Sequence, residues 1–246
     1  MIDPARVDVL VLAGGLGTRL RGVVDDRPKL LAPIGHRPFL DYLLAWLEAQ
    51  GFRRIVLSLG HLAQRVVDYL ATRAPGRLAV ETVIESAPLG TAGALRFARS
   101  ALVSDPVMVM NGDTFLAADL RLFLDRHEGA GAAASLLCTQ VGDGARYGAV
   151  AIDPQGRVTG FAEKNPSRQG PAVVNAGIYA FGREGLAWLD RLTGPSLERD
   201  VLAKMPTGTL QGVVAAGEFV DIGTPESLVA APAILDRHIR PRDPSA

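Results

Sequence analysis

The sequence predicts an α/β fold: one Rossmann-like domain in which a mostly parallel sheet is covered by helices on both faces. Three observations lead to this prediction. Short apolar runs alternate with amphipathic segments along residues 1–115, as expected for βα repeats joined by right-handed crossovers. The 246 residues are enough to bury one large core. Beyond residue 130 the apolar runs lie closer together, which predicts a small antiparallel region.

The elements can be assigned in chain order. Apolar and β-branched runs predict strands, and apolar residues that share one helical face predict helices. The expected strands are residues 7–12, 54–59, 78–84, 106–110, 133–139, 149–152, 158–163, 174–179, 210–214 and 218–220. The expected helices are residues 39–50, 63–71, 93–101, 120–128, 196–205 and 225–235. Residues 153–156 are expected to form a hairpin turn, and Ser196 is expected to cap the helix that follows it.

Composition limits the classes of function. Lys and Arg together equal Asp and Glu together at 26 each, so the formal net charge is zero and no basic field attracts nucleic acid. Cys138 is the only cysteine, which excludes an intrachain disulfide and favours a reducing, cytoplasmic location. The first apolar run is too short for a membrane span and has no basic leader before it, so we expect no membrane partner.

Residues 7–33 carry the strongest functional signal. Glycines at positions 14, 15 and 17 follow the first expected strand, where backbone N–H groups without a neighbouring Cβ can approach an anion. Arg19 and Lys29 add a planar guanidinium and a mobile ammonium. Leu20 rules out the dinucleotide fingerprint, and valines after Gly22 rule out a Walker loop. The stretch therefore predicts a phosphate cradle of another kind, with an ordinary βα turn as the alternative.

The run L-A-G-G-L-G-T-R-L at 12–20, followed by Pro28-Lys29, resembles the signature of the sugar-1-phosphate nucleotidyltransferases. The resemblance implies a glycosyltransferase-A-like variant of the Rossmann fold and a loop that wraps a nucleoside triphosphate. It makes Arg19 and Lys29 catalytic, although Leu30 stands where the family usually has a second proline. The implied nucleotide contacts are Leu12, Ala13, Gly14, Gly15, Gly17, Thr18, Glu85, Pro88, Gly90, Thr91 and Gly112.

Glu85 opens the segment E-S-A-P-L-G-T-A-G, which matches the part of the family that lines the base and ribose pocket. By that resemblance its carboxylate accepts hydrogen bonds from N1 and N2 of a purine, and Gly90 lets the base lie against backbone. The alternative is a solvated loop carboxylate.

Asp113 follows a buried strand in the run N-G-D-T. A carboxylate there is a hard ligand suited to Mg²⁺ bound to substrate phosphates, whereas Asn-Gly-Asp also forms simple turns. The family's x-G-D motif makes Asp113 catalytic and a metal ligand. Asp221, in the run F-V-D-I-G-T-P, is the second metal carboxylate by the same resemblance, with Phe219 replacing the usual tryptophan. Mg²⁺ is therefore the expected cofactor.

Three further segments match the family's sugar-binding half. The implied sugar-phosphate contacts are Tyr147, Gly148, Glu163, Lys164, Asn175 and Gly177. A Glu-Lys pair is also common on surfaces, and glycine within a strand often marks a β-bulge, so both alternatives stay open.

The resemblance implies that a nucleoside triphosphate and a sugar 1-phosphate give a nucleotide sugar and pyrophosphate. We expect one domain over residues 1–236, with a nucleotide half at 1–115, a sugar half at 116–236 and a loose tail at 237–246. No hexapeptide repeats follow, so we expect no acyltransferase module. The oligomeric state stays open, with a homodimer as one option.

The runs at 36–43 and 111–115 most resemble the D-glycero-α-D-manno-heptose 1-phosphate guanylyltransferases, which use GTP, although His36 replaces a small residue. A mannose 1-phosphate guanylyltransferase and an amino-sugar 1-phosphate uridylyltransferase remain alternatives. An enzyme for alcohol phosphates is disfavoured by the sugar-half motifs. A non-catalytic nucleotide-sugar sensor usually loses one of the four functional charges at 19, 29, 113 and 221, and none is lost here.

Overall fold

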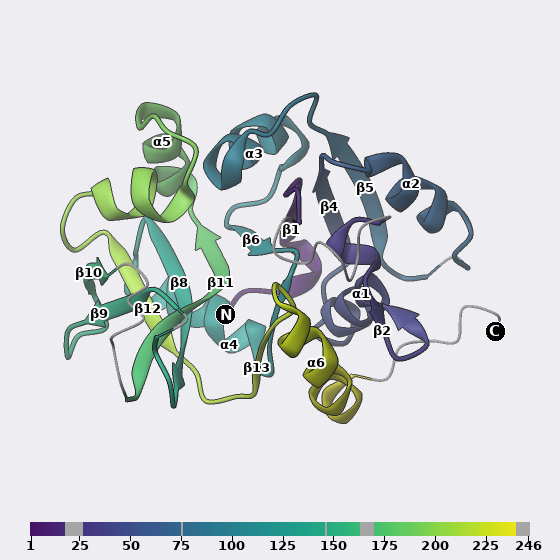
Figure 1. The fold of residues 1–246 in the computed structure, drawn as a ribbon. Helices are drawn as coiled ribbons and strands as arrows, with labels where there is room; N and C mark the ends of the chain where they lie inside the picture. The colour runs from purple at the N-terminus through teal and green to yellow at the C-terminus, as the bar shows by residue number, and fades with distance from the viewer. Residues whose placement is uncertain (18–26, 75, 146, 163–169, 240–246) are drawn as a thin grey trace.

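The computed structural model describes residues 1–17, 27–74, 76–145, 147–162 and 170–239. Across these residues nine strands form one mixed sheet with helices on both faces (Figure 1). The predicted fold class is confirmed. The strands of this sheet are β1 (Asp8–Ala13), β4 (Arg54–Leu59), β5 (Ala79–Ile84), β6 (Val107–Asn111), β8 (Ala134–Val141), β9 (Ala149–Ile152), β10 (Val158–Ala162), β11 (Ala172–Phe181) and β12 (Leu210–Val214).

The parallel part of the sheet has the order β6-β1-β4-β5. In this register Leu12 near the end of β1 is opposite both Ser58 on β4 and Asn111 on β6. The carboxyl ends of these strands therefore lie at one edge, where an α/β sheet binds its ligands.

The antiparallel part begins at β11, which pairs with β6 on one side and β8 on the other. β9 and β10 form the expected antiparallel hairpin, and β9 also pairs with β11. β12 adds to β8 in parallel. Two short ribbons lie outside this sheet: β2 (Pro33–Ile34) pairs with β3 (Arg37–Pro38), and β7 (Thr114–Leu116) pairs with β13 (Phe219–Asp221).

Successive side chains of β1 point to opposite faces, so both faces of the sheet need a cover. Val9 and Val11 pack in a core with α1, α2, α4 and α6, whereas Leu10 packs in a second core with α3 and α5. The α-helices are α1 (Phe39–Ala49), α2 (Ala63–Ala71), α3 (Gly90–Ala98), α4 (Leu120–Ala130), α5 (Arg183–Arg191) and α6 (Pro225–His238). The short helices are η1 (Pro4–Arg6), η3 (Lys29–Leu31), η4 (Arg99–Ala101), η5 (Leu197–Val201) and η6 (Leu202–Lys204).

The structure corrects two helix predictions. α3 begins at Gly90, three residues before the expected start, because Ala92 N donates to Pro195 O at 2.9 Å and draws the first turn onto that segment. No α-helix forms over 196–205; one π turn, η5, leads into one 3₁₀ turn, η6. Ser196 does cap η5, accepting from Arg199 N at 3.2 Å. Both ends of η5, Leu197 and Val201, lie in the core.

In the described part of the chain, no helix has the length and apolar character that crossing a membrane requires.

Candidate active site

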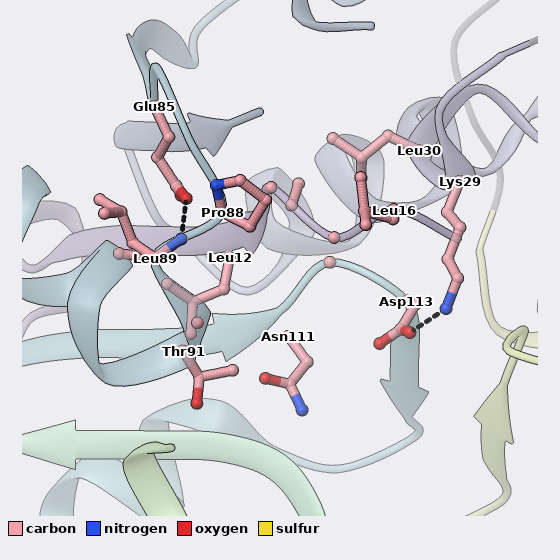
Figure 2. A pocket seen from close by; sticks show the side chains of 16 residues that line it. Leu12, Leu16, Lys29, Leu30, Glu85, Pro88, Leu89, Thr91, Asn111 and Asp113 are labelled. Atoms are coloured by element: carbon pink, nitrogen blue, oxygen red, sulfur yellow. Dashed lines mark hydrogen bonds and ion pairs between the residues drawn. The ribbon is translucent and has the colours of Figure 1, made fainter. Parts of the chain in front are cut away.

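A cavity of about 460 Å³ opens at the carboxyl edge of the parallel strands, within the size range of small-molecule sites. It is bounded by the end of β1, the loop after β5, the first turns of α3, the end of β6 and the segment that contains η3 (Figure 2). Its lining residues are Leu12, Ala13, Gly14, Gly15, Leu16, Lys29, Leu30, Glu85, Pro88, Leu89, Gly90, Thr91, Ala94, Asn111, Gly112 and Asp113.

The structure brings most of the expected nucleotide residues together in this cavity. Those that line it are Leu12, Ala13, Gly14, Gly15, Glu85, Pro88, Gly90, Thr91 and Gly112. Gly17 lies beside the aliphatic part of Lys29: a Cβ on Gly17 would be 3.6 Å from Lys29 Cγ. Its φ of 63° lies in the left-handed region that favours glycine. Thr18 and Arg19 lie outside the described residues. Whether these residues bind nucleotide stays a prediction.

Five lining residues were not predicted from the sequence: Leu16, Leu30, Leu89, Ala94 and Asn111. Four of them are apolar and carry no chemical signal of their own. Asn111 has one, because an amide at the end of a buried strand next to Gly112 and Asp113 shares their position at the ligand edge.

Glu85 is buried, with only 7% of its surface exposed, so the alternative of a solvated loop carboxylate is wrong. Its Oε1 accepts from Ser58 Oγ at 2.9 Å, and its Oε2 accepts from Leu89 N at 3.3 Å. Ser58 is fully buried on β4. The carboxylate is therefore held in a fixed place, with lone pairs left over for a ligand.

Gly14 packs directly against that carboxylate. A Cβ at this position would lie 2.7 Å from Glu85 Oε1 and 3.0 Å from Oε2. A Cβ at Gly60 would in turn lie 2.7 Å from Gly14 O. The backbones of Gly14 and Gly60 and the carboxylate of Glu85 are therefore packed so closely that neither glycine has room for a side chain.

Lys29 and Asp113 meet on the opposite side of the cavity from Glu85 (Figure 2). Lys29 Nζ donates to Asp113 Oδ2 at 2.8 Å, and the two side chains are 18% and 24% exposed. Asp113 stands between β6 and β7, where the sequence predicted a carboxylate directed by the end of a strand. One side of the site therefore carries a fixed carboxylate, and the other an ion pair that substrate can still reach.

Asp221 lies next to Asp113 through strand pairing. On the ribbon of β7 and β13, Asp221 is opposite Thr114, and Ile222 N donates to Asp113 O at 2.9 Å. Gly223 N donates to Asp221 Oδ1 at 2.7 Å, which orients that side chain.

Hard carboxylate oxygens on neighbouring strands fit Mg²⁺, which often takes one or two protein carboxylates and completes its shell with substrate oxygens and water. Among the described residues no group of three His, Cys, Asp or Glu side chains forms a metal cage. The Lys29 ammonium on Asp113 shows that this position accommodates a cation in contact with the carboxylate.

Among the expected sugar residues that the structure describes, Tyr147 contacts β13, the strand that ends in Asp221. The Tyr147 ring packs edge-on against the ring of Phe219, with the two centroids 5.5 Å apart. Phe219 lies two residues before Asp221 on the same strand. Gly148 precedes β9, and a Cβ there would lie 3.3 Å from Ala162 O. Glu163 and Lys164 lie outside the described residues.

The bulge that the sequence left open as an alternative in the strand at 174–179 is present. The pairing of β11 with β8 shifts register between Asn175 and Ile178, and Gly177 has a φ of 74°. A Cβ at Gly177 would lie 2.6 Å from Asn111 Nδ2, so the bulge lies against a residue of the cavity. The contact of Asn175 with a sugar stays a prediction.

Comparisons with known proteins agree with this geometry. The model of the nucleotidyl transferase family matches residues 8–237. D-glycero-α-D-manno-heptose 1-phosphate guanylyltransferase of Aneurinibacillus thermoaerophilus is 33% identical over 95% of this chain and 100% of its own length. Mannose-1-phosphate guanylyltransferase of Mycobacterium tuberculosis is 35% identical over 96% of this chain, which spans 66% of that relative.

A crystal structure of HddC from Yersinia pseudotuberculosis complexed with GMP-PN superposes with a TM-score of 0.82 at 34% identity. The match covers 92% of this chain and 98% of that one. The chain therefore belongs to the nucleotidyl transferase family, as a sugar-1-phosphate nucleotidyltransferase.

Proposed function

We propose that the enzyme transfers a guanylyl group from GTP to D-glycero-α-D-manno-heptose 1-phosphate, giving GDP-heptose and pyrophosphate. The observation that carries the choice of base is the buried carboxylate of Glu85, fixed by Ser58 and Leu89 at one side of the cavity.

Guanine suits that carboxylate better than the other common bases do. Its Watson–Crick edge presents two adjacent donors, N1–H and the N2 amino group, which can meet the two oxygens of one carboxylate. Adenine places an acceptor at N1, and neither cytosine nor uracil presents two adjacent donors along the same edge. An acceptor placed against Glu85 would face the remaining lone pairs of the carboxylate without supplying a donor, and a buried polar group left unsatisfied costs about 1–3 kcal/mol.

The choice of sugar rests on likeness. The runs at 36–43 and 111–115 resemble the heptose enzymes, and heptose-specific relatives from two organisms are 33% and 31% identical to this chain. Mannose 1-phosphate is the alternative acceptor, because relatives named for mannose reach 35% and 37% identity.

The proposed reaction is an in-line displacement at phosphorus. An oxygen of the sugar phosphate attacks the α-phosphorus of GTP, and the bond from that phosphorus to the β,γ-pyrophosphate breaks. The sugar phosphate is already ionised at neutral pH, so no general base is needed. The main barrier is repulsion: two unit charges about 4 Å apart repel by roughly 4 kcal/mol at an effective dielectric constant near 20. Catalysis is therefore mainly positioning and charge neutralisation.

The residues on the phosphate side have the charges that this task needs. Lys29 neutralises phosphate charge when it leaves Asp113 for the substrate. Asp113 and Asp221 would hold Mg²⁺, which when bound supplies positive charge to the phosphate oxygens. In the absence of substrate, the contact between Lys29 and Asp113 keeps both charges balanced in a partly buried place.

A grid of GTP, ATP, UTP, CTP and dTTP against manno-heptose, mannose, glucose and N-acetylated amino-sugar 1-phosphates tests the proposal, with Mg²⁺ present and pyrophosphate release measured. Release confined to GTP with the heptose is expected. Release with mannose would change the acceptor only, release with UTP would contradict the assignment of Glu85, and no release from any pair would favour a non-catalytic sensor.

A further inference from the structure

A chain of hydrogen bonds links the expected sugar contact Asn175 to a segment outside the sequence motifs. Asn175 Nδ2 donates to Tyr179 Oη at 2.8 Å, and Tyr179 Oη donates to Glu198 Oε1 at 2.6 Å. Tyr179 is fully buried on β11, and Glu198 is partly buried in η5. Ser196 Oγ also donates to Glu198, at 3.3 Å.

The charge of Glu198 sets the direction of this chain. An ionised carboxylate can only accept, so the single hydroxyl proton of Tyr179 goes to Glu198, and the Tyr179 oxygen accepts from Asn175. Burial, together with the neighbouring carboxylate, raises the pKa of Tyr179 well above its usual value, so the phenol keeps that proton. Asn175 Oδ1 then accepts from Gly177 N at 2.9 Å. These contacts identify which end of the Asn175 amide is nitrogen and which is oxygen. One N–H of Nδ2 and one lone pair of Oδ1 then remain for a ligand.

The segment that carries Glu198 is anchored to the nucleotide pocket. Leu197 N donates to Thr91 Oγ1 at 2.8 Å, and Ala92 N donates to Pro195 O at 2.9 Å. Thr91 lines the pocket, but Asn175 and Glu198 do not. The network therefore borders the nucleotide site without lining it, on the side where β11 carries the expected sugar contact.

We propose that Tyr179 and Glu198 are positioning residues for sugar recognition, which hold the Asn175 amide in the orientation that meets a sugar hydroxyl. This inference rests on the proposed function, because it takes Asn175 as a sugar contact. It adds that affinity for the sugar is set by buried groups that do not contribute to nucleotide affinity.

Tyr179→Phe is the sharpest test, since it removes one oxygen and breaks both hydrogen bonds with little change in volume. The variant and the wild type are titrated with GDP, GDP-mannose and GDP-D-glycero-α-D-manno-heptose. We expect the affinity advantage of the better nucleotide sugar over GDP to fall about fivefold to tenfold, the effect of one hydrogen bond, while affinity for GDP stays within about twofold. In turnover, KM for the sugar 1-phosphate rises and KM for GTP does not.

Glu198→Gln should act in the same direction as Tyr179→Phe. The Gln amide can donate to the Tyr179 oxygen, which frees the phenolic proton to face Asn175 and removes one of the two contacts that orient the amide, leaving only the bond from Gly177 N.

Tyr42→Phe is the matched control. Tyr42 Oη donates to Asp236 Oδ1 at 2.7 Å, a second bond from a buried tyrosine to a carboxylate, between α1 and α6. Loss of that bond should lower Tm and leave the ratio of nucleotide-sugar to GDP affinity unchanged.

A folded Tyr179→Phe variant with the wild-type affinity ratio and the wild-type KM for sugar overturns the inference. Asn175→Ala separates this failure from a failure of the proposed function. If Asn175→Ala weakens sugar binding and Tyr179→Phe does not, only the positioning role is wrong. If neither variant changes sugar binding, or if wild type binds both nucleotide sugars no better than GDP, the assignment of Asn175 to the sugar site is wrong as well.

Discussion

Gly14→Ala should change the base preference of the enzyme more than its stability. The added methyl group would stand 2.7 Å from Glu85 Oε1 and 3.0 Å from Oε2, about 0.7 Å short of the 3.4 Å at which ordinary contact begins. Backbone on one side and the Ser58 and Leu89 donors on the other confine the carboxylate, so it must rotate or move away from its present place.

The size of the expected change in base preference follows from the number of hydrogen bonds that each base makes to Glu85 in the proposed complex. GTP offers N1–H and the N2 amino group, whereas ITP lacks the amino group and offers N1–H alone. A hydrogen bond to a charged group contributes about 1.5–3 kcal/mol. Misplacing the carboxylate should therefore lower the preference for GTP over ITP by roughly tenfold to 150-fold in kcat/KM.

The assay is steady-state pyrophosphate release with GTP and with ITP at a fixed concentration of sugar 1-phosphate. Gly15→Ala is the matched control, because a Cβ on that neighbouring glycine meets no atom within 4 Å. Gly15→Ala can slow both nucleotides if the backbone must approach phosphate closely, but the ratio of GTP to ITP should stay that of wild type.

A Gly14→Ala variant that folds normally and keeps the wild-type ratio would refute the assignment of the base to Glu85. Equal losses with GTP and ITP would also refute it, since they would indicate a general distortion of the loop rather than the loss of a base contact.

Three further outcomes are expected. Asp113→Ala and Asp221→Ala should each abolish turnover while circular dichroism and Tm stay near wild type; a folded variant with near-normal rate would contradict the metal assignment. Burial lowers the pKa of His127 below 6.5. The unfolded chain therefore takes up a proton that the folded chain resists, so stability should fall as pH drops below about 6.5. Thermal melts of wild type and His127→Gln from pH 5 to 8 would show this as a smaller loss in the variant. Burial raises the pKa of the Cys138 thiol to about 12, so an aromatic disulfide reagent at pH 8 should label it only after unfolding, and rapid labelling of native protein would disagree.

The βα repeats were predictable because each strand and helix carries its own pattern. The strand at 54–59 and the helix at 63–71 match the structure residue for residue. In both cases local sequence and tertiary packing favour the same element, so periodicity alone suffices.

α5 was missed although its sequence pattern is amphipathic, whereas the errors at α3 and η5 occur where tertiary contacts override local preference. Pro88 and Gly90 are typical of a loop, so the sequence favoured a start of α3 at Gly93. Contacts of the first turn with Pro195 and Leu197 extend the helix back to Gly90. The same contacts hold the segment around η5 in place, where a regular helix had been expected.

In the site, groups with strong chemistry were predictable and their supports were not. Asp113 and Glu85 have charges that demand partners, and sequence motifs marked both. Ser58 lies in an apolar strand with nothing in its neighbourhood to distinguish it. Its contact with Glu85 exists only because β4 pairs with β5 and the loop after β5 turns back across the end of the sheet.

Two of the expected sugar residues, Asn175 and Tyr147, are held by different means, and this difference should govern how sugar preference can change. Asn175 lies on β11, whose pairing of Ile178 with Met110 ties it to the strand that ends in Asn111. Moving the backbone of Asn175 would disturb the pairing of β11 with β6, the strand whose end lines the nucleotide pocket. Tyr147 precedes the hairpin of β9 and β10, outside any strand, and its ring packs against Phe219. Side-chain packing can adjust without moving a strand, so we expect changes of sugar preference to tolerate substitution around Tyr147 more readily than around Asn175.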